Sequence, residues 1–551
     1  MPHALSMPST GLQALILCGP GSSFPTFTSN PDEHPKALLP IANRPMVWYP
    51  IDFCLRTGIT TSKALTAAFN TNPYLTALPS PRPDILAPAE LNQNTGTAEI
   101  LRLPEIKELI TNDFIILPCD LVCEPAGEQL LQAWMVKSTT LTSLLNTRSL
   151  ANGDQHRHSG AISVWYDTKT SAPVKGEETD FIATTPLPTT PVPSPKGSIF
   201  QHVSKLVYSI PTDSLNDLME EKKALPIRHS LMKAHSRVRM YTTHRDAHIY
   251  IFPRWILDFV KENERLDSIG EDVVGWWAKA GWQSRLAEKL HFSEVCNDNI
   301  ADEENESVLD DQASSSGSNP DNQEETKEKS PQTTTGGQQA KVNSSSATQT
   351  STFEPPSILA YIHPNKAQEP GSILRRVDTA QLLLAVSLQL AKLPSVEETG
   401  PEASSPFAHP RKVAYPEGVK SRTTITKQDS LIAENVTVEE KTSIKESVIG
   451  ANCQIQEGAK LSQCLLMEGV VVGKGCKLTK CILGKRCIIG DGSVLTDCEV
   501  QENLLVEART EDKDNRLMSS EGLEATEAEM NKVLDKMDQE VAATVDEAGL
   551  E

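Results

Sequence analysis

The sequence predicts an α/β domain followed by a hexapeptide-repeat parallel β-helix, and two observations carry this prediction. In the first half, apolar strands alternate with helical segments up to about residue 122. Such alternation is typical of a parallel or mixed sheet that is covered by helices. In the second half, one apolar position returns from residue 432 to 495 at steps of six, six and five residues, so the pattern repeats every 17 residues, four times.

The β-helix prediction depends on this 17-residue period. Neither the 3.6-residue period of a helix nor the two-residue period of a strand produces it, whereas a three-sided coil of short parallel strands does. An ordinary antiparallel β-domain is the alternative, but its hairpin strands have no reason to keep a 17-residue register. The residues expected in the core of the β-helix include Ile449, Ile455, Leu466, Val472, Leu483 and Ile489.

The acidic charge of the chain is concentrated in two stretches. The 551 residues carry a net charge of -21, and 17 of these negative charges come from residues 301–350 and 501–551. The remaining chain is close to neutral, so the composition argues against binding to nucleic acid or to an anionic membrane. A basic surface on a partner protein is the more natural target for the acidic segments.

Nothing in the sequence has the length and purity of a transmembrane helix, and the first residues lack the basic region of a signal peptide. We therefore expect a cytosolic protein whose eleven cysteines are thiols. Cys464, Cys481 and Cys498 are each 17 residues apart, so they should stack in one column of the β-helix. A metal or disulfide ladder is the alternative for this column, although it has no CxxC pair and no nearby His.

The first elements follow one another as strand, loop and helix. Residues 12–19 form an apolar strand, a loop rich in Gly, Pro and Ser follows, and a helix is expected between Pro45 and Gly58. Residues 94–110 are expected to form a turn into a helix, and residues 113–122 a buried strand that places Asp120 at its carboxyl end. Ligands of such sheets lie at the carboxyl ends of the strands.

The rest of the chain divides by composition. Residues 167–199, rich in Pro and Thr, are expected to form a surface loop, and residues 248–282 a strand and two helices. The low-aromatic stretch 297–355 has the composition of a disordered linker. The expected divisions are an α/β domain at 11–296, the acidic linker at 297–355, the remainder of the α/β body at 356–396, a connector at 397–425, the β-helix at 426–502 and an acidic tail at 503–551.

The acidic tail contains a helical pattern of apolar residues. They lie at i, i+3, i+4, i+7 and i+11, which predicts an amphipathic helix over residues 524–545. Its apolar stripe would dock on this chain or on a partner, and a transient solvated helix is the alternative. The stripe consists of Met530, Val533, Leu534, Met537 and Val541.

At the residues that surround the first loop, the chain resembles the sugar-phosphate nucleotidyltransferase family. The matching motifs are the loop after the first strand, the run PKALLPIANRPM, the GTA at 96–98, and Asp120 after a buried strand. In that family the loop binds nucleotide phosphates and carboxylates hold Mg²⁺. The resemblance implies a Rossmann-like fold and a vestigial nucleotide site made of Gly19, Gly21, Lys36, Gly96 and Asp120.

The chain departs from that family at the residues that handle the phosphates. Active members carry G-x-G-T-R-L, whereas this chain has Ser22 and Ser23 in place of the Thr and the Arg. A single lysine does not replace a positioned guanidinium. We therefore expect no catalysis, no metal and no cofactor. Asp246 is a candidate for a second metal carboxylate by position only.

Simpler interpretations remain for several of these residues. Lys36 could be a surface lysine, and Asp120 a carboxylate left over at a strand end. His156 and His158 have a metal-like spacing, but their polar loop neighbours favour solvated histidines.

With the β-helix added, the chain resembles the subunits of eukaryotic translation initiation factor 2B that combine these two folds. The motifs are DAHIYIFPRWILDF, SIGEDVV, AYIHP and RRVDTAQLLL, and the resemblance covers residues 11–300 and 357–500. It implies a left-handed β-helix. The epsilon subunit has this layout too, but it continues into a helical domain that carries nucleotide exchange, for which about fifty residues after the last repeat are too few.

The resemblance implies a non-catalytic subunit of the guanine-nucleotide exchange complex. Its partners would be an epsilon-type subunit, the alpha, beta and delta subunits, and initiation factor 2 as the substrate. Two other classes remain open. An active sugar-1-phosphate nucleotidyltransferase, similar to mannose-1-phosphate guanylyltransferase, would need the arginine that Ser23 replaces, and a β-helix acyltransferase would need a histidine that the repeats lack.

Overall fold

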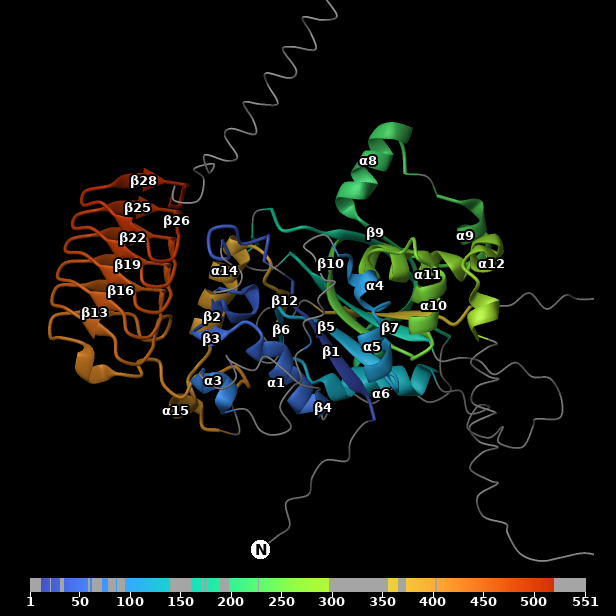
Figure 1. The fold of residues 1–551 in the computed structure, drawn as a ribbon, viewed down its shortest axis with the longest axis horizontal. Coiled ribbons are helices and arrows are strands. Elements are labelled where there is room, and N and C mark those ends of the chain that lie inside the picture. The colour runs from blue at the N-terminus through green and yellow to red at the C-terminus, as the bar shows by residue number, and fades with distance from the viewer. Residues whose placement is uncertain are drawn as a thin grey trace, which may run out of the picture.

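The structure is a computed structural model that describes residues 11–519 with gaps. The longest gaps are 62–71, 78–85, 87–94, 139–159, 189–197, 297–354 and 365–372. The predicted linker at 297–355, except Pro355, and both histidines of the pair His156 and His158 lie outside the described residues, as does the predicted tail helix at 524–545. Two bodies lie side by side: an α/β body and a β-helix (Figure 1).

The α/β body is built on an eight-stranded mixed sheet, so the predicted fold class is confirmed. Its strands β4, β1 and β5 run parallel, whereas β10 is antiparallel to both of its neighbours, β5 and β7. In spatial order the strands are β4 (Thr60–Thr61), β1 (Gln13–Leu17), β5 (Phe114–Pro118), β10 (Arg239–Phe252), β7 (Ala161–Asp167), β11 (Ile358–His363), β9 (Val203–Pro211) and β8 (Asp180–Thr185).

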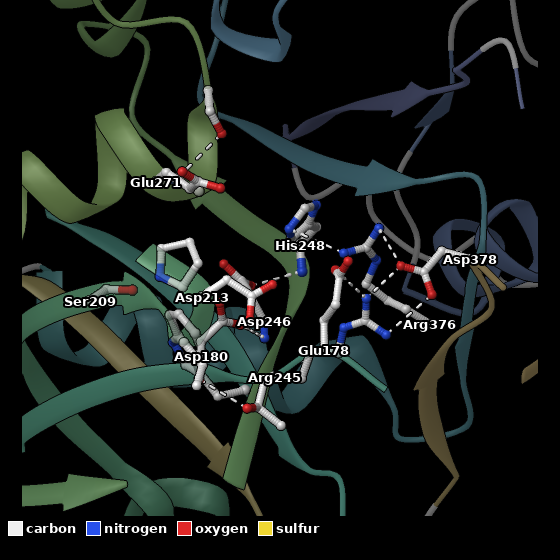
Figure 2. Close-up of a pocket in the computed structure, with 16 residues that line it drawn as sticks. Glu178, Asp180, Ser209, Asp213, Arg245, Asp246, His248, Glu271, Arg376 and Asp378 are labelled. Atoms are coloured by element: carbon white, nitrogen blue, oxygen red, sulfur yellow. Dashed lines mark hydrogen bonds and ion pairs between the residues drawn. The ribbon is translucent and has the colours of Figure 1, made fainter. Parts of the chain in front are cut away.

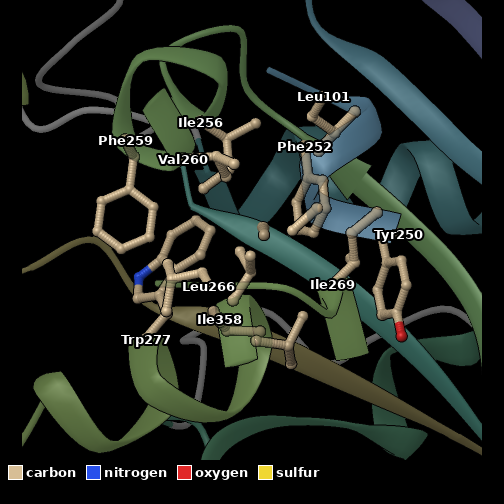
Figure 3. Packing of buried hydrophobic residues seen from close by; sticks show 14 of the residues in the cluster. Leu101, Tyr250, Phe252, Ile256, Phe259, Val260, Leu266, Ile269, Trp277 and Ile358 are labelled. Carbon is tan, nitrogen blue, oxygen red and sulfur yellow. The ribbon is translucent and has the colours of Figure 1, made fainter. Parts of the chain in front are cut away.

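Helices cover both faces of this sheet. Tyr250 and Phe252 of β10 point to one face, while Ile249 and Ile251 point to the other, because successive side chains of a strand alternate. The first face packs against α4 (Thr97–Ile100), α5 (Pro104–Leu109), α10 (Ile256–Glu262), the π-helix η3 (Ile269–Val274), α11 (Gly275–Ala280) and α12 (Ser284–Lys289) (Figure 3). The second face packs against α1 (Trp48–Thr57) and α6 (Gly127–Ser138).

Two predictions about the α/β body need correction. The segment 94–110 forms two short helices, because Pro104 lacks the N–H that a continuous helix requires and begins a new one. The segment 167–199 is not a surface loop throughout, since β8 lies in it and buries Phe181, Ile182 and Ala183. Its Pro and Thr content concealed a strand of six residues that pairs with β9 and β10.

Three sheets of parallel strands form the β-helix, which confirms the solenoid and rules out the antiparallel alternative. The first sheet contains β13 (Thr424–Ile425), β16 (Ser443–Lys445), β19 (Lys460–Ser462), β22 (Lys477–Thr479), β25 (Val494–Thr496) and β28 (Glu511–Lys513). The second contains β14 (Leu431–Ile432), β17 (Val448–Ile449), β20 (Leu465–Leu466), β23 (Ile482–Leu483), β26 (Glu499–Val500) and β29 (Arg516–Leu517). The third contains β15 (Thr437–Val438), β18 (Gln454–Ile455), β21 (Val471–Val472), β24 (Ile488–Ile489) and β27 (Leu505–Val506).

The register of the β-helix matches the prediction, whereas its ends do not. Leu466 pairs with Leu483, 17 residues on, and the six predicted core residues are all buried. The coil begins earlier than residue 426, because Val413 already pairs with Ile432, and it continues past residue 502 to Leu517.

The second sheet of the β-helix faces the α/β body. Its outward side chains Leu431, Val448, Leu465 and Ile482 are buried in one cluster with helix α14 (Ala380–Lys392) and the loop around Phe24. The hydroxyl of Thr26 donates to Glu499 at 2.8 Å, and Asn43 Nδ2 donates to the carbonyl of Ile449 at 3.0 Å. The loop after β1 is therefore held against the β-helix.

The cysteines are free thiols, as expected. Cys464, Cys481 and Cys498 form a buried column, and the thiol of Cys481 donates to the carbonyl of Leu495 at 3.3 Å. Burial raises the pKa of the Cys487 thiol to about 12, which is the behaviour of an inert structural cysteine. None of the helices in the described part of the chain is both long and apolar enough to span a bilayer.

Candidate functional site

The candidate site lies at the carboxyl ends of β1 and β5. Asp120 follows β5 and precedes β6 (Leu121–Cys123), and β6 pairs with β12 (Leu374–Arg376). This pairing places Arg376 beside Asp120, although 256 residues separate them in the chain. The opposite wall of the site is formed by β10 (Figure 2).

Lys36 and Asp120 are in direct contact, so Lys36 is not a surface lysine. Lys36 Nζ donates to Oδ2 of Asp120 at 2.7 Å, and the two side chains are only 11% and 2% exposed. The ammonium also lies 5.6 Å from the centre of the Phe24 ring. Burial favours the neutral form of the lysine, but the charge of Asp120, its hydrogen bond and the neighbouring Cys119 together raise the pKa of Lys36.

Arg376 is the second cation on Asp120. Its Nε donates to Oδ1 of Asp120 at 3.3 Å, and its Nη2 to Oδ2 at 3.4 Å. Burial alone would raise the pKa of Asp120, but the charges of Arg376 and Lys36 hold it well below its usual range. Asp120 is therefore a buried carboxylate with two counter-ions.

The loop after β1 is closed by its own hydrogen bonds. Phe24 N donates to the carbonyl of Gly21 at 2.8 Å, and the Thr28 hydroxyl donates to the same carbonyl at 2.7 Å. Gly21 has a φ of +92° and leaves no room for a Cβ beside Thr28, so glycine is needed here to form the turn. Ser23, in the position of the missing arginine, is exposed to solvent, as is Gly19.

Gly96 allows two segments of the α/β body to approach each other closely. A Cβ on Gly96 would lie 2.3 Å from the carbonyl oxygen of Asp267, and Ala98 N donates to that same oxygen at 2.9 Å. The hydroxyl of Thr97 accepts from the amide of Ile269 at 2.9 Å. The GTA motif thus anchors the start of η3.

His248 stands beside Arg376 at a bulge in β10. The pairing of β10 with β7 shifts between Asp246 and Tyr250, and His248 adopts a φ of +52°, a conformation that normally favours glycine. Arg376 Nη1 donates to Nε2 of His248 at 3.2 Å. Burial and the neighbouring charge of Arg376 lower the pKa of His248, so its imidazole is neutral and can accept this hydrogen bond.

Asp246 lies on the far side of His248 (Figure 2). Its carboxylate accepts from the amide of His248 at 2.8 Å and from the Tyr250 hydroxyl at 2.5 Å, and its own amide donates to Asp180 Oδ2 at 2.8 Å. Burial and the charge of Asp180 raise the pKa of Asp246 to about 7. Burial raises the pKa of Asp180 to about 6.

A cavity of about 260 Å³ is lined in part by Asp180, Asp246, His248 and Arg376. Arg245 lines it and donates to Asp378 Oδ2 at 2.5 Å, and beside it Arg375 donates to both oxygens of Glu177 at 2.8 and 2.9 Å. Acidic side chains predominate among the acidic and basic residues of the lining, which are Glu178, Asp180, Asp213, Arg245, Asp246, Glu271, Arg376 and Asp378, and the neutral His248 lies among them.

The carboxylates do not fit the Mg²⁺ site that the nucleotidyltransferase fold implies. Asp120 already accepts from Lys36 and Arg376, and Asp246 is bound to Tyr250 and to the amide of His248. Arg376 and His248 stand between the two carboxylates that would have to share the ion. The position of Asp246 does not make it a partner of Asp120.

Several residues of the site were not identified from the sequence. Arg376 lies in the recognised motif RRVDTAQLLL, where two adjacent charges before an apolar helix are the signal that could have found it. His248 lies in the motif DAHIYIF, within a strand that is otherwise buried and apolar. Asp180 had no signal, because its segment reads as a loop.

Known proteins resemble this chain in its β-helix and over about half of its length. The family model described as the EIF2B subunit epsilon LbH domain matches residues 414–511, which is the β-helix. In Schizosaccharomyces pombe, translation initiation factor eIF2B subunit gamma is 26% identical over 283 residues, or 49% of this chain and 52% of the relative. This chain is similar to eIF2B subunit gamma.

Gamma subunits of two further organisms support the same similarity. The protein of Caenorhabditis elegans is 23% identical over 48% of this chain and 57% of the relative, and that of Dictyostelium discoideum is 25% identical over 42% and 47%. The chain spans about half the length of the gamma subunits it matches. The expected resemblance to initiation factor 2B subunits is confirmed, with gamma as the subunit named.

Proposed function

We propose that the chain is a non-catalytic subunit of the guanine-nucleotide exchange complex of translation initiation. In this role it pairs with an epsilon-type subunit, joins alpha, beta and delta subunits, and promotes the exchange of GDP for GTP on initiation factor 2 in the cytosol. The nucleotidyltransferase fold is then a scaffold.

The contact between Arg376 and Asp120 is the observation that carries the non-catalytic part of the proposal. Nucleotidyl transfer needs cations that act on the phosphates, and a carboxylate free to bind Mg²⁺. Here Lys36 and Arg376 both form ion pairs with Asp120, at 2.7 and 3.3 Å. Ser23 supplies no cation in the loop, and this supports a site that neither holds the metal nor neutralises the phosphates.

The complex-forming part of the proposal is supported by the similarity to gamma subunits and by the joined folds. A buried apolar cluster connects the β-helix with α14 and the loop after β1. A rigid body of this kind presents a broad surface to other proteins. Exchange requires binding energy to be spent on releasing a tightly held nucleotide, and a broader contact with the substrate supplies more of it.

The experiment is a pyrophosphate-release assay on the purified chain with sugar 1-phosphate, nucleoside triphosphate and Mg²⁺. We expect no release above the rate without protein, because the loop lacks the arginine that would act on the phosphates, and Lys36 and Arg376 are both paired with Asp120. A working mannose-1-phosphate guanylyltransferase serves as the positive control. Turnover by the chain would overturn the proposal in favour of an active sugar-1-phosphate nucleotidyltransferase.

A second arm tests the partner. The chain should co-purify with an epsilon-type subunit when the two are expressed together. Failure to bind any epsilon-type subunit would count against membership of the complex, whatever the transferase assay shows.

A further inference from the structure

The third sheet of the β-helix carries a column of aliphatic side chains that are exposed or partly exposed. Val471, Ile488 and Leu505 occupy the same position in three successive coils, because β21 pairs with β24 and β24 with β27. Ile488 is 44% exposed and Leu505 is 67% exposed. In the two earlier coils the corresponding residues are polar, Thr437 and Gln454. The apolar character is thus confined to the coils nearest to residue 519.

We propose that residues 524–545 of this chain cover the column, with Met530, Leu534 and Met537 placed against Leu505, Ile488 and Val471. The sequence predicts an amphipathic helix over these residues, and they lie outside the described part of the chain. The proposal names the docking surface for that helix. It is independent of the proposed role in nucleotide exchange.

The point at which the chain leaves the β-helix supports this occupant. The amide of Ser519 donates to the side-chain oxygen of Gln501 at 2.7 Å, and Gln501 lies in the turn between β26 and β27. In the 17-residue register, Gly522 and Leu523 follow Leu505 and Val506. The described chain therefore ends beside the turn that leads into β27, at the same end of the β-helix as Leu505.

The spacing of the two surfaces also agrees. Neighbouring strands of a sheet lie about 4.8 Å apart, so three coils place Val471 about 10 Å from Leu505. A helix rises about 5.4 Å per turn, so Met530 and Met537 lie about 10 Å apart along its axis. One helical turn per coil brings three residues of the stripe against three residues of the column.

The size of the column favours a tethered segment over a separate protein. A stable interface between two proteins buries about 1,600 Å² in total, which three aliphatic side chains do not approach. A segment of the same chain needs far less, because a short linker holds it at an effective concentration in the millimolar range. Ten residues join Ser519 to Met530, and about 3.4 Å per residue is enough to reach any of the three coils.

The test is site-specific photo-crosslinking in the full-length chain, at a concentration where it is monomeric. A benzophenone amino acid at Leu505 should crosslink within the chain to peptides from residues 524–545. The same probe at Thr479, which is exposed on the first sheet and so on another face of the β-helix, should give at most a tenth of that yield.

Matched variants of the tail separate apolar docking from mere proximity. Leu534→Asp with Met537→Asp should abolish the crosslink from position 505. Gln539→Asp, on the opposite face of the predicted helix, should leave it unchanged. Equal yields from positions 505 and 479, or a yield that is insensitive to Leu534→Asp, would overturn the proposal. Crosslinks that map to a second copy, or to an epsilon-type subunit added to the sample, would assign the column to that partner and also overturn it.

Discussion

Arg376 reaches across the site to Asp120, and the two side chains form a buried ion pair at 3.3 Å. Together with Lys36, Arg376 compensates the charge of this buried carboxylate without a metal ion or a proton. This arrangement turns a strand-end carboxylate of an enzyme fold into a structural element. We therefore expect that the loss of Arg376 lowers the free energy of unfolding.

Arg376→Ala should destabilise the chain by about 3 kcal/mol, because removing one partner of a buried pair leaves the other charge poorly compensated. Lys36 remains on Asp120 and limits the loss. The measurement is urea-induced unfolding followed by circular dichroism. Lys441→Ala is the control, because its ion pair with Glu457 is exposed and its removal should leave the midpoint unchanged. Equal midpoints for all three proteins would contradict a structural role for the Asp120 pair.

The stability should also depend on pH through Asp246. Its pKa is about 7 in the folded chain, above the value of about 4 expected when unfolded, so its contribution to stability is fully present below about pH 4. That contribution is lost as the pH rises from about 4 through 7, because over this range the Asp246 carboxyl ionises in the unfolded chain but stays protonated in the folded chain. Asp246→Asn has no such proton to lose.

The measurement is the unfolding midpoint of both proteins at pH 5, 6, 7 and 8. The variant should gain stability relative to the natural chain as the pH rises, and the difference should level off above pH 7. A constant difference over the whole range would show that the pKa of Asp246 is not raised.

The β-helix register predicts opposite effects for two neighbouring positions. Val472 is fully buried, so Val472→Asp would bury a carboxylate without a partner and should cost several kcal/mol. Lys474 is exposed at the following corner, where its backbone N–H donates to Asp491 and its carbonyl accepts from the amide of Gly492. Lys474→Asp should therefore fold normally. Thermal unfolding distinguishes the two, and similar melting temperatures for both variants would show that the register is wrong.

The inner coils of the β-helix could be predicted because their period is regular, and its outer coils were missed where the period fails. Ile425 and Ile432 are seven residues apart instead of five, so the first coil has two additional residues. In the last coil the core position falls on Asp512, a charged residue that breaks the apolar pattern. Backbone pairing continues through both irregularities, and only the structure shows it.

The candidate site was predictable to the extent that its residues lie in local motifs. Lys36 and Asp120 were identified this way, and they prove to be in contact. The residues that determine what the site can do, Arg376 and His248, reach it through the pairing of β12 with β6 and through a bulge in β10. Such long-range pairing leaves no periodic signal in the sequence.

The rate of GDP release from initiation factor 2 tests the central claim most directly. Initiation factor 2 loaded with a fluorescent GDP would be mixed with excess GTP and an epsilon-type subunit, with or without this chain. We expect that the chain alone releases no GDP. When the chain is added to the epsilon-type subunit, it should accelerate GDP release. An epsilon-type subunit that works equally fast without the chain would contradict it.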